Sequence, residues 1–109
     1  MNLGIHLQQR KKPEEGLAML REALKGFEAT MPDHWMVSAT RTYVGDCVTD
    51  LARYEESERL ITQGYGDMAR SLGPGHARTM KAARYAARLY KTWAKQDQAA
   101  EWEAKTKAP

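Results

Sequence analysis

The feature that most constrains the fold is an internal repeat with a period of 41 or 42 residues. Residues 32–35 (Pro-Asp-His-Trp) are echoed by residues 74–77 (Pro-Gly-His-Ala) 42 positions later. Residues 13–16 (Pro-Glu-Glu-Gly) are echoed by residues 54–57 (Tyr-Glu-Glu-Ser) and again by residues 96–99 (Gln-Asp-Gln-Ala). A repeat of this length predicts that one small structural unit is built more than once and buries its apolar face against its neighbours.

The local pattern within each unit is helical. Leu17, Leu20, Leu24 and Phe27 follow the spacing of one face of an α-helix, and no segment alternates with the period of a strand. Breakers such as Pro32 and the Gly-Pro-Gly at residues 73–75 separate the helices. We expect six helices, over residues 2–11, 13–30, 34–52, 55–71, 76–95 and 97–105. Asp33 and Asp97 are the expected caps of the third and sixth.

The small and apolar positions of the repeat resemble those of the tetratricopeptide repeat. The matching residues are Leu3, Gly4, Leu7, Gly16, Leu20 and Ala23 in the first unit, then Val44, Gly45, Val48, Ser57, Ile61 and Gly64 in the second. The third unit gives Ala86, Ala87, Tyr90 and Ala99 and departs from the pattern at Glu103. The period of 41 or 42 residues is longer than the usual repeat of about 34 residues. In this respect the chain resembles the kinesin-light-chain-like variant.

The resemblance implies a fold as well as a repeat. It implies an all-α domain over residues 1–109, in which antiparallel helical hairpins stack as a right-handed solenoid of about six helices. The units would be residues 1–31, 32–73 and 74–109, and the chain could be a piece of a longer array. Gly4, Gly45 and Ala87 are expected where helix backbones approach closely.

Charge and composition favour a protein partner. The 17 basic and 14 acidic residues give a net charge of +3 without a dense basic patch, so we do not expect a nucleic-acid partner. No run approaches the roughly 20 apolar residues of a membrane span. A single cysteine, Cys47, allows no internal disulfide and suits a reducing compartment. With no signal-peptide pattern at the first residues, the expected location is the cytoplasm.

No reactive constellation stands out, so we expect no enzyme activity, cofactor or metal. Residues 64–69 formally match a loose nucleotide-binding glycine pattern, but they lie in an expected helix without the strand that this motif requires. His34 and His76 lack further cysteine or histidine at metal-binding spacing, and we interpret them as residues that pack or cap at helix starts. Cys47 lies on an apolar face and is interpreted as a core thiol.

The resemblance also implies a binding surface, the concave groove lined by the first helix of each hairpin. On the third helix that face should hold Ala39, Thr42, Tyr43, Asp46, Thr49 and Asp50. On the fifth it should hold Lys81, Arg84, Tyr85, Arg88 and Lys91, four of which form one basic stripe. The stripe suggests a ridge for an acidic peptide segment, with Tyr43 and Tyr85 as flat contact area. The alternative is an ordinary solvated face, partly neutralised by Asp46 and Asp50.

One known groove chemistry fits poorly. The carboxylate clamp of chaperone-binding members needs Lys and Asn where Met1 and Ile5 stand, and Asn and Arg where Tyr43 and Tyr85 stand. Only Lys81 agrees with that clamp. Chaperone binding of this type is therefore not expected.

Three functions remain open at this point. The leading hypothesis is a scaffold that binds a peptide or protein in the groove. Similar units follow the kinase domain of bacterial serine/threonine kinases, so the chain could instead be a non-catalytic C-terminal segment of such a signalling protein. It could also be a structural spacer that self-associates through exposed repeat ends.

Overall fold

Five α-helices make up the part of the chain that the structure, a computed structural model, describes: residues 13–107. They are α2 (Pro13–Thr30), α3 (Trp35–Asp50), α4 (Tyr54–Ser71), α5 (Ala77–Thr92) and α6 (Gln96–Thr106). No residue between 13 and 107 adopts a strand. The all-α class is therefore confirmed, while the expected opening helix over residues 2–11 lies outside the described residues.

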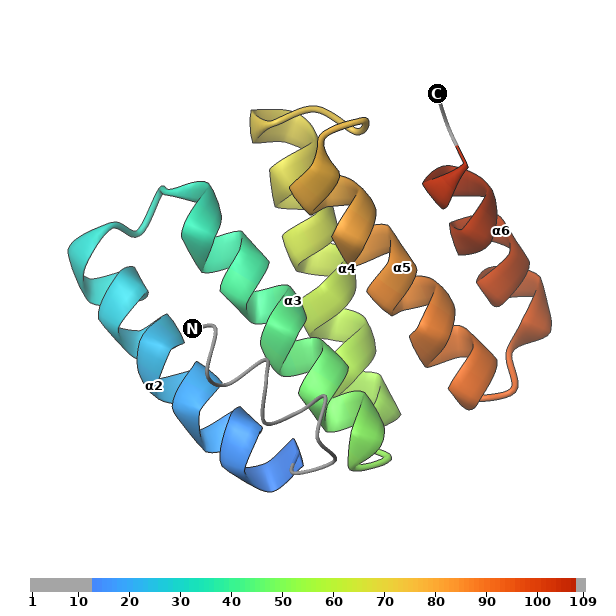
Figure 1. Ribbon diagram of the computed structural model, residues 1–109, viewed down its shortest axis with the longest axis horizontal. Helices are drawn as coiled ribbons and strands as arrows, with labels where there is room; N and C mark the ends of the chain where they lie inside the picture. The colour runs from blue at the N-terminus through green and yellow to red at the C-terminus, as the bar shows by residue number, and fades with distance from the viewer. Residues whose placement is uncertain (1–12, 108–109) are drawn as a thin grey trace.

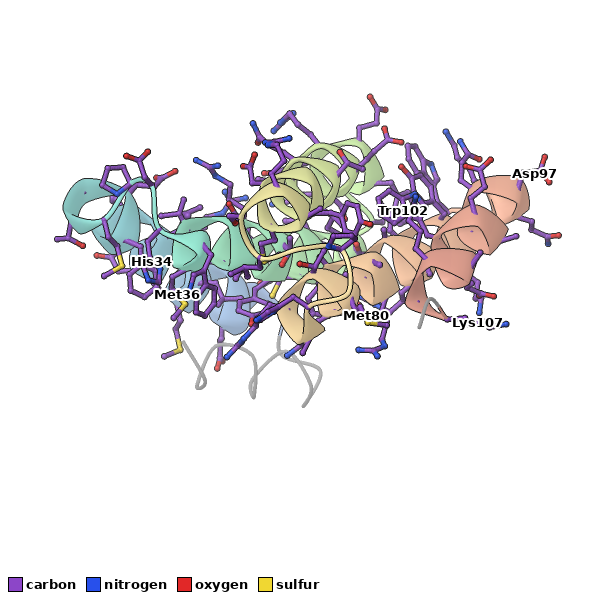
Figure 2. The ribbon with its side chains drawn as sticks, turned by 90° about the horizontal axis from the view of Figure 1, so that it is seen from above. His34, Met36, Met80, Asp97, Trp102 and Lys107 are labelled. Carbon is purple, nitrogen blue, oxygen red and sulfur yellow. The ribbon has the colours of Figure 1, made fainter. Side chains whose placement is uncertain are left out.

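Consecutive helices pack against each other, and α3 also contacts α5 across the intervening helix (Figure 1). Figure 1 shows α3 and α5 side by side, running in the same direction, with α4 behind them. Seen from above in Figure 2, α4 lies on one side of the layer that α3 and α5 form. The stacking of hairpins into a right-handed solenoid stays a prediction.

The 42-residue repeat is visible in the structure as a repeated cap. The helices α3 and α5 begin 42 positions apart, and so do α4 and α6. His34 and His76 are the N-caps of α3 and α5, and each accepts a backbone N–H two residues on, at Nδ1 distances of 3.0 and 3.1 Å. The capping prediction for the two histidines is confirmed.

The aspartate caps that we expected are wrong. The cap of α3 is His34 rather than Asp33, because its ring nitrogen reaches the free N–H of Met36. Asp97 is not a cap because α6 begins one residue earlier, at Gln96, and it stands in the first turn instead. A carboxylate there still offsets the positive end of the helix dipole.

The central element is α3, which is buried on almost every side. Its apolar and small residues are distributed all around the helix, as expected for a helix enclosed by neighbours. Val37, Val44, Cys47 and Val48 are each at most 2% exposed. One cluster of buried residues joins α2, α3, α4 and α5, and a second joins α4, α5 and α6.

Two glycines set the distance between α3 and α4. A Cβ at Gly45 would lie 2.6 Å from Cγ1 of Ile61, and one at Gly64 would lie 2.7 Å from the carbonyl oxygen of Ser38. A side chain at Gly45 would therefore displace the buried Ile61 side chain, and one at Gly64 would push the backbone of α3 away. The prediction that Gly45 marks a close approach is confirmed.

Candidate functional site

The contact between α3 and α5 is made by one arginine and two aspartates. Arg88 of α5 donates from Nε and Nη2 to Asp46 Oδ1, at 2.9 and 2.8 Å, and from Nη2 to the Asp46 carbonyl oxygen at 2.9 Å. Its Nη1 donates to Asp50 Oδ1 at 2.8 Å. Asp46 is only 6% exposed, so the guanidinium neutralises a carboxylate that the fold has largely removed from water.

The electrostatics of this cluster keep Arg88 charged. Burial by itself lowers the pKa of Arg88, but the charge and hydrogen bonds of Asp46, together with those of Asp50, outweigh it and raise the pKa above its ordinary value. Charge-assisted hydrogen bonds of this kind are stronger than neutral ones. The cluster therefore acts as a fixed clamp between two helices that are 42 residues apart in the sequence.

Aromatic rings and cations continue the contact toward the start of α5. The rings of Tyr43 and Tyr85 meet edge to face, 6.0 Å between centroids. Nζ of Lys81 lies 5.2 Å from the centroid of the Tyr43 ring and 6.0 Å from that of Tyr85. Burial first, and then the Asp46 carboxylate, raises the pKa of Tyr85 above its ordinary value. Cations over tyrosine faces are attracted by the ring quadrupole.

Arg78 adds a second bridge between the two helices. Its Nη1 donates to the Tyr43 hydroxyl at 2.8 Å, and its Cζ lies 5.2 Å from the centroid of the Trp35 ring. The α3–α5 surface, as we use the term, comprises Trp35, Tyr43, Asp46, Asp50, Arg78, Lys81, Arg84, Tyr85 and Arg88. All of these residues lie on α3 or α5, which are the first helices of the α3–α4 and α5–α6 hairpins.

Most of the expected groove residues come together here. Tyr43, Asp46, Asp50, Lys81, Tyr85 and Arg88 contact one another across the α3–α5 junction. Arg84 shares the exposed side of α5 with Lys81 and Arg88 by helical spacing, and it makes no ion pair with any residue in 13–107. Tyr43 and Asp46 are only 2% and 6% exposed, so the expectation that Tyr43 offers flat contact area is wrong. That the other residues line a binding groove stays a prediction.

The eighth residue, Lys91, belongs elsewhere. Its Nζ pairs with Glu103 Oε1 of α6 at 2.6 Å, and the hydrogen bond and charge of Lys91 lower the pKa of Glu103. Lys91 stands in the last turn of α5, and its partner lies on the neighbouring helix α6. The basic stripe is thus divided between two neighbours.

Two threonines expected in the groove face α4 instead, so those expectations were wrong. Thr49 Oγ1 hydrogen-bonds with Ser57 Oγ at 2.6 Å, and Thr42 packs where a side chain on Gly64 would stand. Both are at most 2% exposed. Because α3 is enclosed, its polar residues line hairpin contacts as well as the surface.

Sequence reasoning missed Trp35 and Arg78. Arg78 precedes Lys81 by three positions, so helical spacing alone places it on the same face, and that signal was available. Trp35 is the first residue of α3, and only the side-by-side arrangement of α3 and α5 shows that Arg78 reaches its ring.

The other motifs have structural explanations within the described residues. The glycine pattern at residues 64–69 lies inside α4. Cys47 is 0% exposed, and burial, then Asp46 and Asp50, raises its pKa to about 12. Between residues 13 and 107 no group of three His, Cys, Asp or Glu side chains lies close enough to hold a metal ion. None of these helices is both long and apolar enough to cross a membrane.

A scan against protein-family models found no match, and a search of curated proteins found none either. The tetratricopeptide resemblance therefore rests on the internal repeat of this chain.

Proposed function

We propose that this protein is an interaction module of the tetratricopeptide kind, which binds a protein or peptide partner along the α3–α5 surface. The observation that carries the proposal is the Arg88 clamp, which fixes two helices so that rings from α3 and α5 lie beside the cations of α5. Tyrosine, tryptophan and arginine are the residues most enriched at the energetic centres of protein interfaces.

The rigidity of the surface supports the same function. Arg78 and Arg88 both cross from α5 to α3, and the helices themselves are held by buried core residues. A surface that is already ordered loses little conformational entropy when a partner binds. A concave solenoid groove, with α3 and α5 as its inner helices, would present this surface to an extended or helical segment.

Affinity purification with matched variants tests the proposal. The surface variant carries Arg78→Glu and Arg84→Glu, and the control carries Arg53→Glu and Arg59→Glu, which are exposed on the α3–α4 turn and on α4. Both variants change net charge equally. We expect one partner protein to be retained by the wild type and the control and lost by the surface variant. The same partner, once purified, should again bind the wild type and the control. Equal recovery by all three would remove the assignment.

A further inference from the structure

Three cations on the exposed side of α5 have no carboxylate partner between residues 13 and 107. Arg78 binds the Tyr43 hydroxyl and the Trp35 ring, Lys81 lies over two tyrosine rings, and Arg84 is exposed. These four side-chain pairings of Arg78 and Lys81 are with neutral groups, so the charge of the two cations is not cancelled. They follow each other at intervals of three residues, which places them along one helical ridge.

The basic side chains in the C-terminal half of α5 are paired with carboxylates. Arg88 is neutralised by Asp46 and Asp50, and Lys91 by Glu103. The surface therefore has an open positive half near the start of α5 and a closed half near its end. We call the open half, made of Arg78, Lys81 and Arg84, the cationic ridge.

The backbone adds to the positive potential at this end. The helices α3 and α5 run in the same direction, so their positive N-terminal ends lie at the same side of the molecule (Figure 1). Neither helix has an acidic residue in its first turn, whereas α2, α4 and α6 each have at least one. An anion close to these two ends is stabilised by the helix dipoles as well as by the ridge.

We infer that the cationic ridge recognises an acidic peptide segment of the partner, which docks over the end where α3 and α5 begin. This inference rests on the proposed function and specifies its ligand chemistry and position. The carboxylates of the segment pair with Arg78, Lys81 and Arg84, and its apolar portions lie along the exposed edges of Trp35 and Tyr85. Arg88 acts here as a positioning residue that holds α3 against α5, because its Nε, Nη1 and Nη2 donate to Asp46 and Asp50.

The rings make an acidic peptide a better occupant than a nucleic acid. Single-stranded nucleic acids bind by stacking bases on free aromatic faces. Tyr43 is only 2% exposed and lies under Lys81, and the Trp35 ring lies under Arg78. The faces needed for stacking are covered, while the cations above them point to an anionic chain.

The test uses the purified full chain and an N-acetylated, C-amidated hexaglutamate peptide as the probe. Amide resonances are followed by NMR, and affinity is measured by calorimetry at 50 and 300 mM NaCl. We expect shifts concentrated in residues 77–85 of α5 and in the first turn of α3, and several-fold weaker binding at the higher salt concentration. Hexalysine, which has the opposite charge, should produce no such shifts.

Matched neutral variants separate the ridge from general charge. The ridge variant carries Arg78→Gln, Lys81→Gln and Arg84→Gln, and the control carries Lys25→Gln, Arg53→Gln and Arg59→Gln, all exposed and without ion pairs in the described part of the chain. We expect about tenfold weaker hexaglutamate binding in the ridge variant and less than about twofold in the control, since each exposed ion pair contributes modestly. Arg84→Gln alone, which removes no hydrogen bond or ion pair between residues 13 and 107, should cost about two- to threefold.

Three results would overturn the inference. They are unchanged hexaglutamate affinity in a folded ridge variant, shifts centred on another helix, and tighter binding of a ten-nucleotide single-stranded DNA than of hexaglutamate. Circular dichroism shows whether each variant is folded, and the single Arg84 variant keeps the test valid if the triple variant is not. Because the probe needs no natural partner, failure here leaves the affinity purification to decide the proposed function independently.

Discussion

Ala52 and Ala94 stand 42 positions apart and adopt the same left-handed backbone conformation, with φ of 61° and 62°. Each lies in the turn between the two helices of a hairpin, and the residue that follows it donates its N–H to an equivalent carbonyl. Those bonds run from Arg53 to Val48 at 2.9 Å and from Lys95 to Tyr90 at 2.8 Å. The repeat thus extends to backbone geometry, although the two turns share only the alanine.

Replacing either alanine with glycine should stabilise the protein. A side chain in the left-handed region costs about 1–2 kcal/mol, and glycine removes this cost while losing somewhat more chain entropy on folding. We expect Ala52→Gly and Ala94→Gly each to raise the free energy of unfolding by up to about 1 kcal/mol, measured by urea titration. Ala100→Gly, in the exposed interior of α6, is the control and should lower it by about 1 kcal/mol. Destabilisation at both turns would contradict the turn geometry.

Removing the Arg88 side-chain charge should destabilise the fold. Arg88→Met leaves the largely buried Asp46 carboxylate without its guanidinium, and Arg88 itself is 41% exposed. We expect a loss of about 2 kcal/mol, below the range of a fully buried pair because water reaches part of the site. Adding Asp46→Asn to Arg88→Met should recover part of this loss, whereas Asp50→Asn alone should cost less than about 1 kcal/mol. Equal losses for Arg88→Met and Asp50→Asn would show that Asp46 is not the important partner.

Two glycines of α4 should respond oppositely to alanine. At Gly64 the new Cβ would meet the Ser38 carbonyl oxygen at 2.7 Å, whereas at Gly66 the nearest atom is Arg70 Nη1 at 3.6 Å. We expect Gly64→Ala to lower the midpoint temperature of thermal unfolding, with a loss of about 2–3 kcal/mol. Gly66→Ala should raise stability by about 0.5–1 kcal/mol through helix propensity alone. The two glycines share a helix, so a similar response at both would rule out the close approach.

Cys47 should make stability depend on alkaline pH. Its pKa is near 9 in the unfolded chain and is raised to about 12 in the fold, so the unfolded chain loses the proton first as pH rises. The contribution is therefore complete below about pH 9 and is lost as pH rises toward 12. Between pH 8 and 9.5 we expect the free energy of unfolding to fall by about 0.8 kcal/mol more in the wild type than in Cys47→Ala. Parallel pH curves for the two proteins would be inconsistent with a buried thiol.

The helices could be predicted because their signals are local. With Pro13 at the start of α2, the breakers near Pro32 and at residues 73–75, and the apolar spacing, nine of the ten expected boundaries of α2 to α6 lie within two residues of those observed. The caps were predicted only in part: His34 and His76 cap helix starts as expected, but the sequence did not show that His34 takes this place at α3 instead of Asp33. How helices that are not consecutive pack against each other, such as α3 and α5, depends on side-chain packing that the sequence pattern does not specify.

The candidate site was predictable only in part. The resemblance implied that Tyr43 and Tyr85 belong to one groove, and helical spacing placed Lys81, Arg84 and Arg88 on one stripe of α5. Which cation meets which carboxylate was not predictable, because α3 and α5 are distant in sequence and their register is set by the core. Arg88 and Lys91 look equivalent in the sequence, yet one binds Asp46 and the other Glu103.

The enclosure of α3 has a consequence for how the molecule comes apart. The helix α3 packs against α2, α4 and α5 at once. If the α5–α6 hairpin detached from the α3–α4 hairpin, buried residues of α3 would become exposed to water. Loss of order should therefore begin at α6, whose only fully buried residue among those described is Ala99, and should reach α3 last. Amide protons of Val44 and Val48 should exchange with deuterium only when the whole chain opens, whereas those of α6 exchange through local fraying.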